Sequence, residues 1–346
     1  MKVLVIGGTG LISTSIVDQL IQRGDQVTVY NRGKSEKRFG GGVGELHGDK
    51  FDAPAFEAEL QKNSFDAAID MMSFSAEHGQ SLLRAVKGKV QHLVVCSTVC
   101  VYGGYLSRVP ATDDEPHKPV SGYGRNKSLL EGVILAANGH ESLSTTILRP
   151  SHTTGEGSGI SGLLFDDSLI SRLRHGRPVV IHDDGNSPWA MAHVSDVARG
   201  FMNALLNEKA YGQSYHLTSD EHTTWDGIYR AMAEAAQAQV PQIAHAPSSW
   251  LYRVAPRRSV GIEYIFKYPG SFNNAKARHD LGFKTSVTLV ETLRRSLAWM
   301  ESKGKLKKVS EEPLQDILVD ALMTKKDPAQ YPGFVDYNPW GNSTTS

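Results

Sequence analysis

KVLVIGGTGLIS, residues 2–13, joins an apolar strand pattern directly to a glycine-rich turn and to the start of a helix. Gly7, Gly8 and Gly10 permit a tight turn and let backbone N–H groups approach a pyrophosphate at the helix N-terminus. A second strand pattern ends at Tyr30, about twenty residues further on, as a dinucleotide-binding βαβ unit requires. The alternative is a glycine turn that binds nothing, and the order of strand, turn and helix argues against it.

The end of the second strand pattern indicates which dinucleotide the chain binds. An acidic residue there would hold the ribose 2′-hydroxyl of NAD, whereas an arginine accommodates the 2′-phosphate of NADP. The segment that follows Tyr30 has no carboxylate and contains Arg32, with Lys34 and Lys37 adding positive charge. We therefore favour NADP(H), with NAD(H) as the alternative, although these residues could also form a solvated basic loop. The cofactor-binding residues expected in the turn and at the next two strand ends are Gly7, Thr9, Gly10, Leu11, Ile12, Asn31, Arg32 and Asp49.

The first half of the chain alternates β-branched strand patterns with helical patterns. Such alternation predicts an α/β fold in which a doubly wound parallel sheet of the Rossmann type carries helices on both faces. The expected strands are Lys2–Ile6, Gln26–Tyr30, Glu45–His47, Phe65–Asp70, His92–Ser97 and Ser144–Leu148, and the expected helices include Ile12–Arg23 and Gly124–Ala137.

After Pro150 the pattern changes, and we expect a smaller C-terminal substrate lobe. Helical patterns cover Leu164–Arg174, His193–Leu206, Trp225–Ala236 and Leu289–Lys303, and a strand pattern covers Pro178–His182. The expected dinucleotide-binding domain spans residues 1–162, and segments near 178–217 return to it. The substrate lobe lies mainly within residues 163–303, and residues 304–346 form a C-terminal extension with one amphipathic stretch at Leu314–Met323.

Tyr123 and Lys127 are the candidate catalytic pair. They stand four residues apart in a helical pattern, which places both side chains on one face of the helix. A lysine ammonium beside a phenol stabilises the phenolate, lowers the tyrosine pKa, and can also hold the ribose of a nicotinamide. Upstream, a buried strand pattern ends in Ser97 and Thr98, at the sheet edge where ligands of α/β proteins bind.

Together these residues resemble the extended short-chain dehydrogenases/reductases, the NAD-dependent epimerase/dehydratase family. The resemblance covers roughly residues 1–300. It implies that Thr98 hydrogen-bonds the reacting oxygen, that Tyr123 moves its proton, and that Lys127 tunes Tyr123 and holds the ribose. It also implies that the backbone near Pro150 borders the nicotinamide. The motifs that carry it are the glycine turn, Ser97-Thr98, Val101-Tyr102-Gly103, Tyr123 with Lys127, Leu148-Arg149-Pro150, Asp184-Gly185, His193–Ala198 and Ala275–Phe283.

The chain departs from the sugar-nucleotide enzymes of this family at four positions. Val99-Cys100 stands where the dehydratases have Asp-Glu, which argues against dehydration by that mechanism. His152 occupies the place of an asparagine, and Trp189 the place of an arginine that meets the diphosphate. Either residue could line a substrate pocket by hydrogen bonding and stacking, or be an ordinary buried residue.

Cys100 has two interpretations. It resembles the acid/base cysteine of GDP-fucose synthase and GDP-mannose 3,5-epimerase, with His152, Asp166 or Asp167 as the opposing acid. The other interpretation, which we favour because cysteine packs well, is a small apolar residue at the end of a strand.

The bulk properties exclude several classes of protein. Lys+Arg and Asp+Glu both number 37, so no net charge attracts nucleic acid or an anionic membrane. Two cysteines are too few for a disulfide framework, the histidines show no metal-binding spacing, and the N-terminus lacks a signal-peptide pattern. We therefore expect a metal-free cytoplasmic protein.

The leading hypothesis is an NAD(P)-dependent oxidoreductase or epimerase. It would act at a secondary alcohol or ketone of a small-molecule substrate that is sugar-like or a sugar nucleotide, and the family resemblance implies a homodimer. The alternative is a non-catalytic nucleotide- or RNA-binding protein, because Asn31-Arg32-Gly33 and the layout also resemble chloroplast stem-loop RNA-binding proteins.

Overall fold

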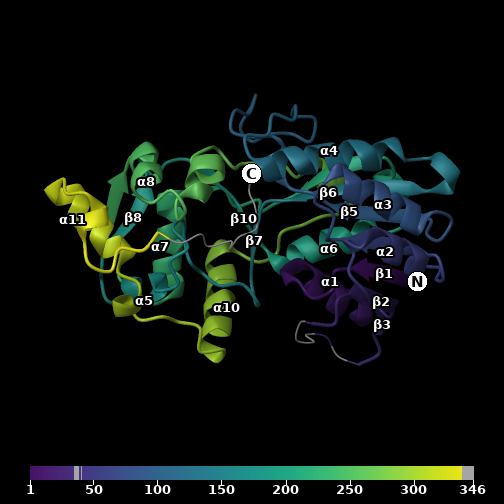
Figure 1. The fold of residues 1–346 in the computed structure, drawn as a ribbon, viewed down its shortest axis with the longest axis horizontal. Coiled ribbons are helices and arrows are strands. Elements are labelled where there is room, and N and C mark those ends of the chain that lie inside the picture. Colours follow the sequence, from purple (N-terminus) through teal and green to yellow (C-terminus); the bar gives the residue numbers. More distant parts are fainter. Residues whose placement is uncertain (35–38, 40, 337–346) are drawn as a thin grey trace.

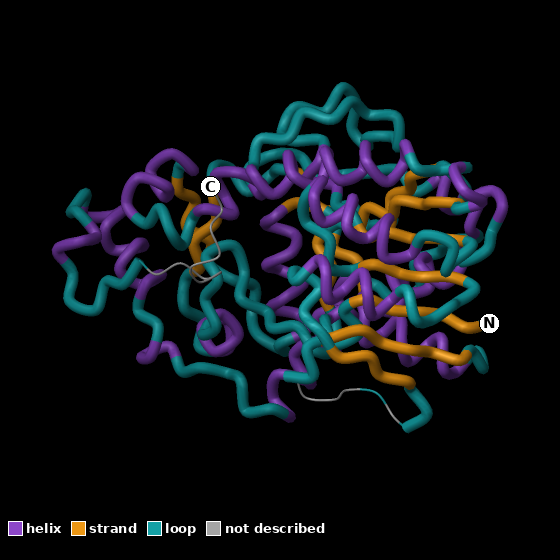
Figure 2. Tube along the Cα trace, turned by 45° about the vertical axis from the view of Figure 1, so that its right-hand side comes forward, coloured by secondary structure: helices purple, strands orange, loops and turns teal. Residues whose placement is uncertain are grey.

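A computed structural model describes residues 1–34, 39 and 41–336. Its centre is a sheet of seven parallel strands, in the order β11-β6-β5-β4-β1-β2-β3 (Figure 2). β1 lies between β2 and β4, because the chain first winds outward through β2 and β3 and then crosses to the other side. The strands are β1 (Lys2–Ile6), β2 (Gln26–Asn31), β3 (Gly44–His47), β4 (Ala67–Asp70), β5 (His92–Cys96), β6 (Ser144–Pro150) and β11 (Gln213–Leu217).

Helices cover both faces of this sheet, which confirms the predicted fold class (Figure 1). Val3 and Val5 of β1 point to one face, which is covered by α1 (Leu11–Gln22), α6 (Val194–Ala204) and α9 (Ala275–Leu281). The alternating residues Leu4 and Ile6 point to the other face. That face is covered by α2 (Ala53–Leu60), α3 (Ala76–Val86) and α4 (Gly122–Ala136).

A smaller C-terminal lobe has a core of its own, as expected (Figure 1). Its core is built mainly from helices around a pair of parallel strands. The lobe contains α5 (Leu169–Arg174), β8 (Val179–His182), α7 (Trp225–Ala235), β13 (Ile243–Ala246), α8 (Ser248–Val254), α10 (Leu289–Ser302) and α11 (Leu314–Thr324). Two further short pairs lie outside the central sheet, namely β7 (His152–Thr154) with β10 (Met191–His193), and β9 (Pro188–Trp189) with β12 (Thr223–Thr224).

Short irregular helices complete the described chain. A π-helical turn covers Ile262–Phe266. The 3₁₀ turns are η1 (Val99–Val101), His140–Ser142, Glu208–Ala210, Val309–Glu311 and Pro328–Gln330.

Three segments behave differently from expectation. The helix predicted to start at Leu164 begins at Leu169, because Phe165 has a φ of 51° and Asp166 accepts hydrogen bonds from both the backbone and the hydroxyl of Ser168. Of the region expected to return to the sheet, α6 and β11 do so, but β8 pairs with β13 in the lobe. α9 packs on the sheet although it lies within the predicted lobe range, so the domain boundaries stay a prediction.

Part of the predicted C-terminal extension belongs to the lobe. Leu314 and Leu318 of α11 are buried in the lobe core, and the Gln315 side chain accepts a hydrogen bond of 2.9 Å from the Val180 backbone.

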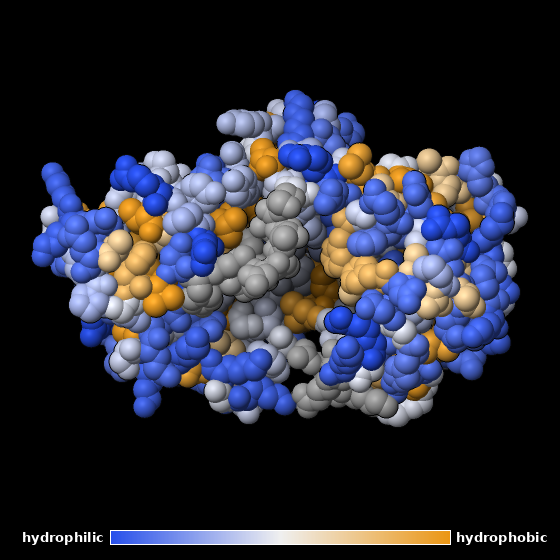
Figure 3. All heavy atoms as spheres, viewed as in Figure 1, coloured by the Kyte–Doolittle hydropathy of each residue, from blue (hydrophilic) through white to orange (hydrophobic). Residues whose placement is uncertain are grey.

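The face drawn in Figure 3 is largely hydrophilic over both lobes. Among the described residues, no helix combines the length and hydropathy needed to cross a bilayer.

Candidate functional site

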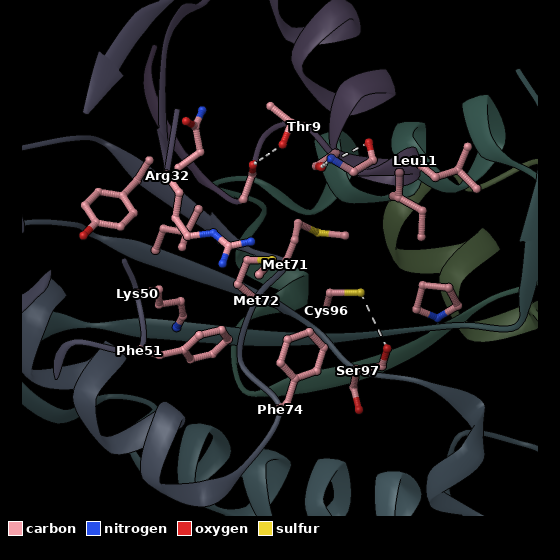
Figure 4. Close-up of a pocket in the computed structure, with 18 of the residues that line it drawn as sticks. Thr9, Leu11, Arg32, Lys50, Phe51, Met71, Met72, Phe74, Cys96 and Ser97 are labelled. Carbon is pink, nitrogen blue, oxygen red and sulfur yellow. Dashed lines mark hydrogen bonds between the residues drawn. The ribbon is translucent and has the colours of Figure 1, made fainter. Parts of the chain in front are cut away.

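A cleft of about 540 Å³ opens at the carboxyl ends of the central strands (Figure 4). Its walls come from the glycine turn, from the ends of β2 to β6, and from the first turns of α4. Ligands of open α/β sheets bind at this edge. The structure gathers here all the predicted cofactor residues and three of the four predicted catalytic residues: Gly7, Thr9, Gly10, Leu11, Ile12, Asn31, Arg32, Asp49, Pro150, Thr98, Tyr123 and Lys127.

The glycine turn can accept a diphosphate. Gly7 and Gly8 have φ values of +113° and +57°, and a Cβ on Gly8 would lie 2.8 Å from Val29. The Gly10 N–H donates to the Ser13 hydroxyl at 2.8 Å, which ties the turn to the first turn of the helix. α1, all of it described, has no acidic side chain in its first turn, so the positive end of its dipole faces the cleft uncompensated.

The ends of β2 and β3 form the opposite end of the cleft. Asn31 accepts a hydrogen bond of 2.7 Å from the Gly33 backbone, and Arg32 extends from the end of β2 into the cleft (Figure 4). The Asp49 carboxylate accepts a hydrogen bond of 3.0 Å from the Phe51 backbone. Lys34 also lines the cleft, whereas Lys37 lies outside the described residues.

Lys127 is held inside the cleft by backbone oxygens. Its side chain is 2% exposed, and its ammonium donates to the carbonyls of Ser73 at 2.6 Å and Cys96 at 2.8 Å. The ammonium also lies 4.9 Å from the centre of the Phe74 ring. Burial lowers the pKa of Lys127. An ammonium has three N–H donors, so one remains for a ribose hydroxyl once both carbonyl bonds are made.

Tyr123 lies in the first turn of α4, directly above the end of β5. Ser121 caps this helix by accepting the Gly124 N–H at 3.0 Å. A Cβ on Gly124 would lie 2.3 Å from the Cys100 carbonyl, so glycine is what lets α4 pack directly against η1. Thr98 caps η1, and its hydroxyl accepts the Cys100 N–H at 3.2 Å.

The environment of Tyr123 is only partly polar. The residue is 39% exposed and lines the cleft, and burial is the largest cause of the raised pKa of its hydroxyl group. The Cys100 and Cys96 thiols raise the pKa further, and a hydrogen bond with Thr98 lowers it. Lys127 is not among the groups that shift this pKa, so the lowering expected from Lys127 stays a prediction.

A second cavity of about 290 Å³ adjoins the cleft. Thr98 and Ser151 line both spaces, and the second contains the predicted substrate residues His152 and Trp189 together with Cys100. Trp189 donates its indole N–H to His152 Nδ1 at 3.3 Å, and burial lowers the pKa of His152 to about 4. Trp189 also stacks on Trp225, with ring centres 5.2 Å apart, which limits the ring surface left for a substrate.

The structure separates Cys100 from two of the three proposed opposing acids. Asp166 and Asp167 do not line the cavity that contains Cys100. The Asp166 carboxylate accepts a hydrogen bond of 2.8 Å from the Ser168 backbone, and the Asp167 carboxylate forms an ion pair of 3.1 Å with Lys307. His152 does line it. Burial raises the pKa of the Cys100 thiol, which lowers the fraction of thiolate that is available to act as a base.

Sequence reasoning missed an ion pair in the cleft wall. Lys50 lies 3.1 Å from Asp70 and donates to the Ser73 hydroxyl at 2.7 Å. Asp70 ends an otherwise apolar strand, and this charged residue at a buried strand end could have indicated that a cation lies nearby. Lys50, which follows Asp49, was a candidate for that cation. Among the described residues, no group of three His, Cys, Asp or Glu side chains could hold a metal ion.

Comparisons with known proteins agree with this architecture. The model of the NAD dependent epimerase/dehydratase family matches residues 3–217. A chloroplast stem-loop binding protein of 41 kDa from Arabidopsis thaliana is 26% identical over 334 residues, covering 92% of this chain and 84% of that protein. A 2′-dehydrokanamycin reductase from Streptomyces kanamyceticus is 27% identical over 251 residues, covering 72% of this chain and 70% of the reductase. A UDP-glucose 4-epimerase structure from Thermotoga maritima, with UDP-glucose, has a TM-score of 0.72 at 20% identity and covers 88% and 99% of the two chains.

Proposed function

The chain belongs to the NAD-dependent epimerase/dehydratase family, and we propose that it transfers a hydride between a nicotinamide dinucleotide and a secondary alcohol or ketone of a sugar-like substrate. One observation carries this proposal. The glycine turn, Tyr123, Lys127 and Thr98 line one cleft, and that cleft meets a second cavity at Thr98. A cofactor in the cleft and a substrate in the cavity would therefore meet beside Tyr123.

Each catalytic side chain has a defined role in this proposal. Thr98 hydrogen-bonds the reacting oxygen, and Tyr123 takes the hydroxyl proton in oxidation or returns it in reduction. Lys127 holds the ribose through its remaining N–H and stabilises the phenolate of Tyr123. The bound nicotinamide would accept or supply the hydride. Net redox and transient redox within an epimerisation use the same residues.

Tyr123→Phe tests the assignment, because it removes the hydroxyl and keeps the ring. We expect kcat to fall by about 10²–10⁴-fold, with an unchanged dissociation constant for the cofactor. Turnover is followed by nicotinamide absorbance with a panel of hexoses and UDP-hexoses. Tyr105→Phe is the matched control, because Tyr105 is an exposed tyrosine that does not line the cleft. Full activity of Tyr123→Phe would contradict the proposed mechanism, and binding of neither NADH nor NADPH would contradict the function itself.

We propose NADP(H) as the preferred cofactor, with NAD(H) as the alternative. Arg32 extends into the cleft at the end of β2 and can form a bidentate contact with a 2′-phosphate. Arg32→Ala should weaken NADPH binding by about ten- to a hundredfold and leave NADH binding nearly unchanged. Calorimetric titration of the emptied protein with both cofactors measures this. Equal losses for the two cofactors, or tighter binding of NADH by the unsubstituted protein, would contradict the preference.

A non-catalytic RNA-binding function is the second candidate. It is favoured by the similarity to the chloroplast stem-loop binding protein, which extends over 92% of this chain. The zero net charge argues against it, because RNA binding depends on neutralising phosphates. Stem-loop RNA binding that survives moderate salt without cofactor, together with failure to bind either nicotinamide dinucleotide, would favour this candidate.

The homodimer implied by the family resemblance is part of the leading proposal, and light scattering tests it.

A further inference from the structure

The residues that line the cavity beside Cys100 fall into two chemical sets, which we call its polar wall and its lobe wall. The polar wall consists of polar and small residues at the ends of β5 and β6 and on β7, namely Thr98, Cys100, Ser151, His152 and Thr154. The lobe wall consists of large apolar side chains of the lobe, namely Phe165, Met232, Ile265, Phe266 and Leu293, and the Phe266 ring also stacks on His152. Further lining comes from the apolar Val99, Ile160, Trp189 and Met191 and from Ser161. At about 290 Å³, the cavity lies just below the range of about 300–1,000 Å³ for small-molecule sites.

No charged partner faces this cavity from the described part of the chain. None of the described residues that line it is Asp, Glu, Lys or Arg. His152 is the one titratable nitrogen base among them, and burial lowers its pKa to about 4, so it is neutral near pH 7. A phosphate or an ammonium group placed here would lose its hydration without gaining a counter-charge, which is strongly unfavourable.

The hydrogen bond between Trp189 and His152 assigns the tautomer of the histidine. An indole N–H can only donate, so His152 Nδ1 must be the acceptor and must carry no hydrogen. The neutral ring then carries its hydrogen on Nε2. Trp189 therefore supports His152 as a neutral hydrogen-bond donor in the polar wall, beside the hydroxyls of Thr98 and Ser151.

We propose that this cavity binds an uncharged, unphosphorylated sugar or glycoside rather than a sugar nucleotide. A sugar ring has hydroxyl groups around its edge and C–H groups on its faces, and this amphipathic character matches the two walls. The hydroxyl edge lies against Thr98, Ser151 and His152, and a C–H face or an apolar aglycone lies against Ile265 and Phe266. The inference rests on the proposed function, because the reacting carbon must lie where Thr98 joins the cavity to the cofactor cleft.

The test compares neutral and nucleotide-linked forms of the same sugars. Full-length protein saturated with its preferred nicotinamide dinucleotide is titrated calorimetrically with a panel of phenyl hexosides and with the corresponding UDP-hexoses. We expect at least one phenyl hexoside to bind more tightly than its UDP-hexose by about tenfold or more. Tighter binding of a UDP-hexose, or binding of neither series, would overturn the inference.

Ile265→Ala locates the binding to this cavity. Shortening Ile265 removes apolar contact from the lobe wall, so the affinity for the phenyl hexoside should fall by about tenfold. Val240→Ala is the matched control, because Val240 is 78% exposed and outside the cavity, and it should leave the affinity unchanged. Equal affinities of the two variants for the phenyl hexoside would show that the glycoside does not bind in this cavity.

The cofactor titration separates this inference from the proposed function. If Ile265→Ala retains full affinity for the nicotinamide dinucleotide, a lost phenyl hexoside signal reflects the substrate cavity alone. If the unsubstituted protein turns over UDP-hexoses with Tyr123-dependent kinetics, the proposed function stands and the neutral-substrate inference fails. If it binds no dinucleotide, the proposed function itself fails.

Discussion

Lys50 and Asp70 show how single residues at the cleft wall organise the candidate catalytic group. Asp70 is 0% exposed, and its carboxylate accepts the Ser73 backbone N–H at 3.0 Å as well as the Lys50 ammonium. Lys50 in turn binds the Ser73 hydroxyl, and the Ser73 carbonyl holds Lys127. The buried Lys50 and Lys127 are therefore linked through Ser73. The ion pair of Lys50 with Asp70 holds Ser73 in place, and Ser73 in turn positions Lys127.

Lys50→Met should destabilise the protein strongly. It leaves the Asp70 carboxylate buried without its cation, and breaking a buried ion pair in this way costs about 3–5 kcal/mol. Urea unfolding measures the change in the free energy of unfolding. Lys62→Met is the control, because Lys62 pairs with Glu59 at 2.7 Å on the exposed surface, where solvent screens the charges. Similar losses in both variants would contradict a special role for the buried pair.

The first turns of α4 are the element on which the geometry of the proposed catalytic residues depends. Gly124 allows the helix backbone to approach the Cys100 carbonyl, and the neighbouring Tyr123 hydrogen-bonds to Thr98. Gly132 lies on the same helix, and an added Cβ there would meet nothing within 4 Å. The two glycines therefore differ in packing while sharing a helix.

Gly124→Ala should reduce activity although alanine is the better helix former. The new Cβ would force α4 away from η1 and separate Tyr123 from Thr98, and misplacement by about 1 Å can cost about 10²-fold in rate. Gly132→Ala should keep full activity and raise the free energy of unfolding by about 0.5–1 kcal/mol. Steady-state kinetics and urea unfolding of both variants provide the comparison. Full activity of Gly124→Ala would show that the close packing is dispensable.

The sequence predicted six of the seven strands of the central sheet, because most residues of these six strands are buried and several of the strands carry runs of β-branched residues. β1 has its predicted bounds, and β2 extends one residue beyond the predicted Tyr30. Parallel strands end at one edge, so residues far apart in sequence could be assigned to one cleft. This explains why Thr98, Asp49 and Pro150, each placed at or near a strand end, line the same space.

Structural features that arise from contacts between residues far apart in the chain could not be predicted from local sequence patterns. β11 reads QSYHL, which lacks a clear apolar pattern, and its place in the sheet comes from pairing with β6. The left-handed conformation of Phe165 delays the start of α5, and no local signal announced it. The ion pair of Lys50 with Asp70 joins two strand ends, so neither residue reveals the contact by itself.

At the scale of the whole molecule, buried neutral histidines link stability to pH. His92, His152 and His216 each have their pKa lowered to about 4, chiefly by burial. For His216, burial and the nearby Arg149 charge lower the pKa, whereas the hydrogen bond between its Nδ1 and the Asn273 carbonyl at 3.1 Å raises it. Its Nε2 lies 2.7 Å from the Tyr102 hydroxyl, which accepts a hydrogen bond from Arg149. Protonation would remove the acceptor on Nε2 and add a charge near Arg149.

The sign of this linkage follows from which state binds the proton first. The unfolded histidines titrate near pH 6.5 and the folded ones near pH 4, so between these values the unfolded state binds more protons. Stability should therefore fall as pH drops through this window. Asp113 opposes the trend, because burial raises its pKa to about 6, and the folded state gains stability as pH falls from about 6 towards 3.8. The three histidines together lower the free energy of unfolding on acidification by more than the single Asp113 carboxyl group raises it.

We expect the free energy of unfolding to decrease by several kcal/mol between pH 7 and pH 4.5, since each unmatched proton contributes about 1.4 kcal/mol per pH unit. His216→Gln should flatten this slope by up to one proton, because glutamine does not titrate. His279→Gln is the control, because the His279 side chain is 79% exposed. Urea unfolding at a series of pH values gives the slopes directly. A stability that rises on acidification would mean that carboxyl groups such as Asp113, rather than the buried histidines, dominate the proton linkage of the folded chain.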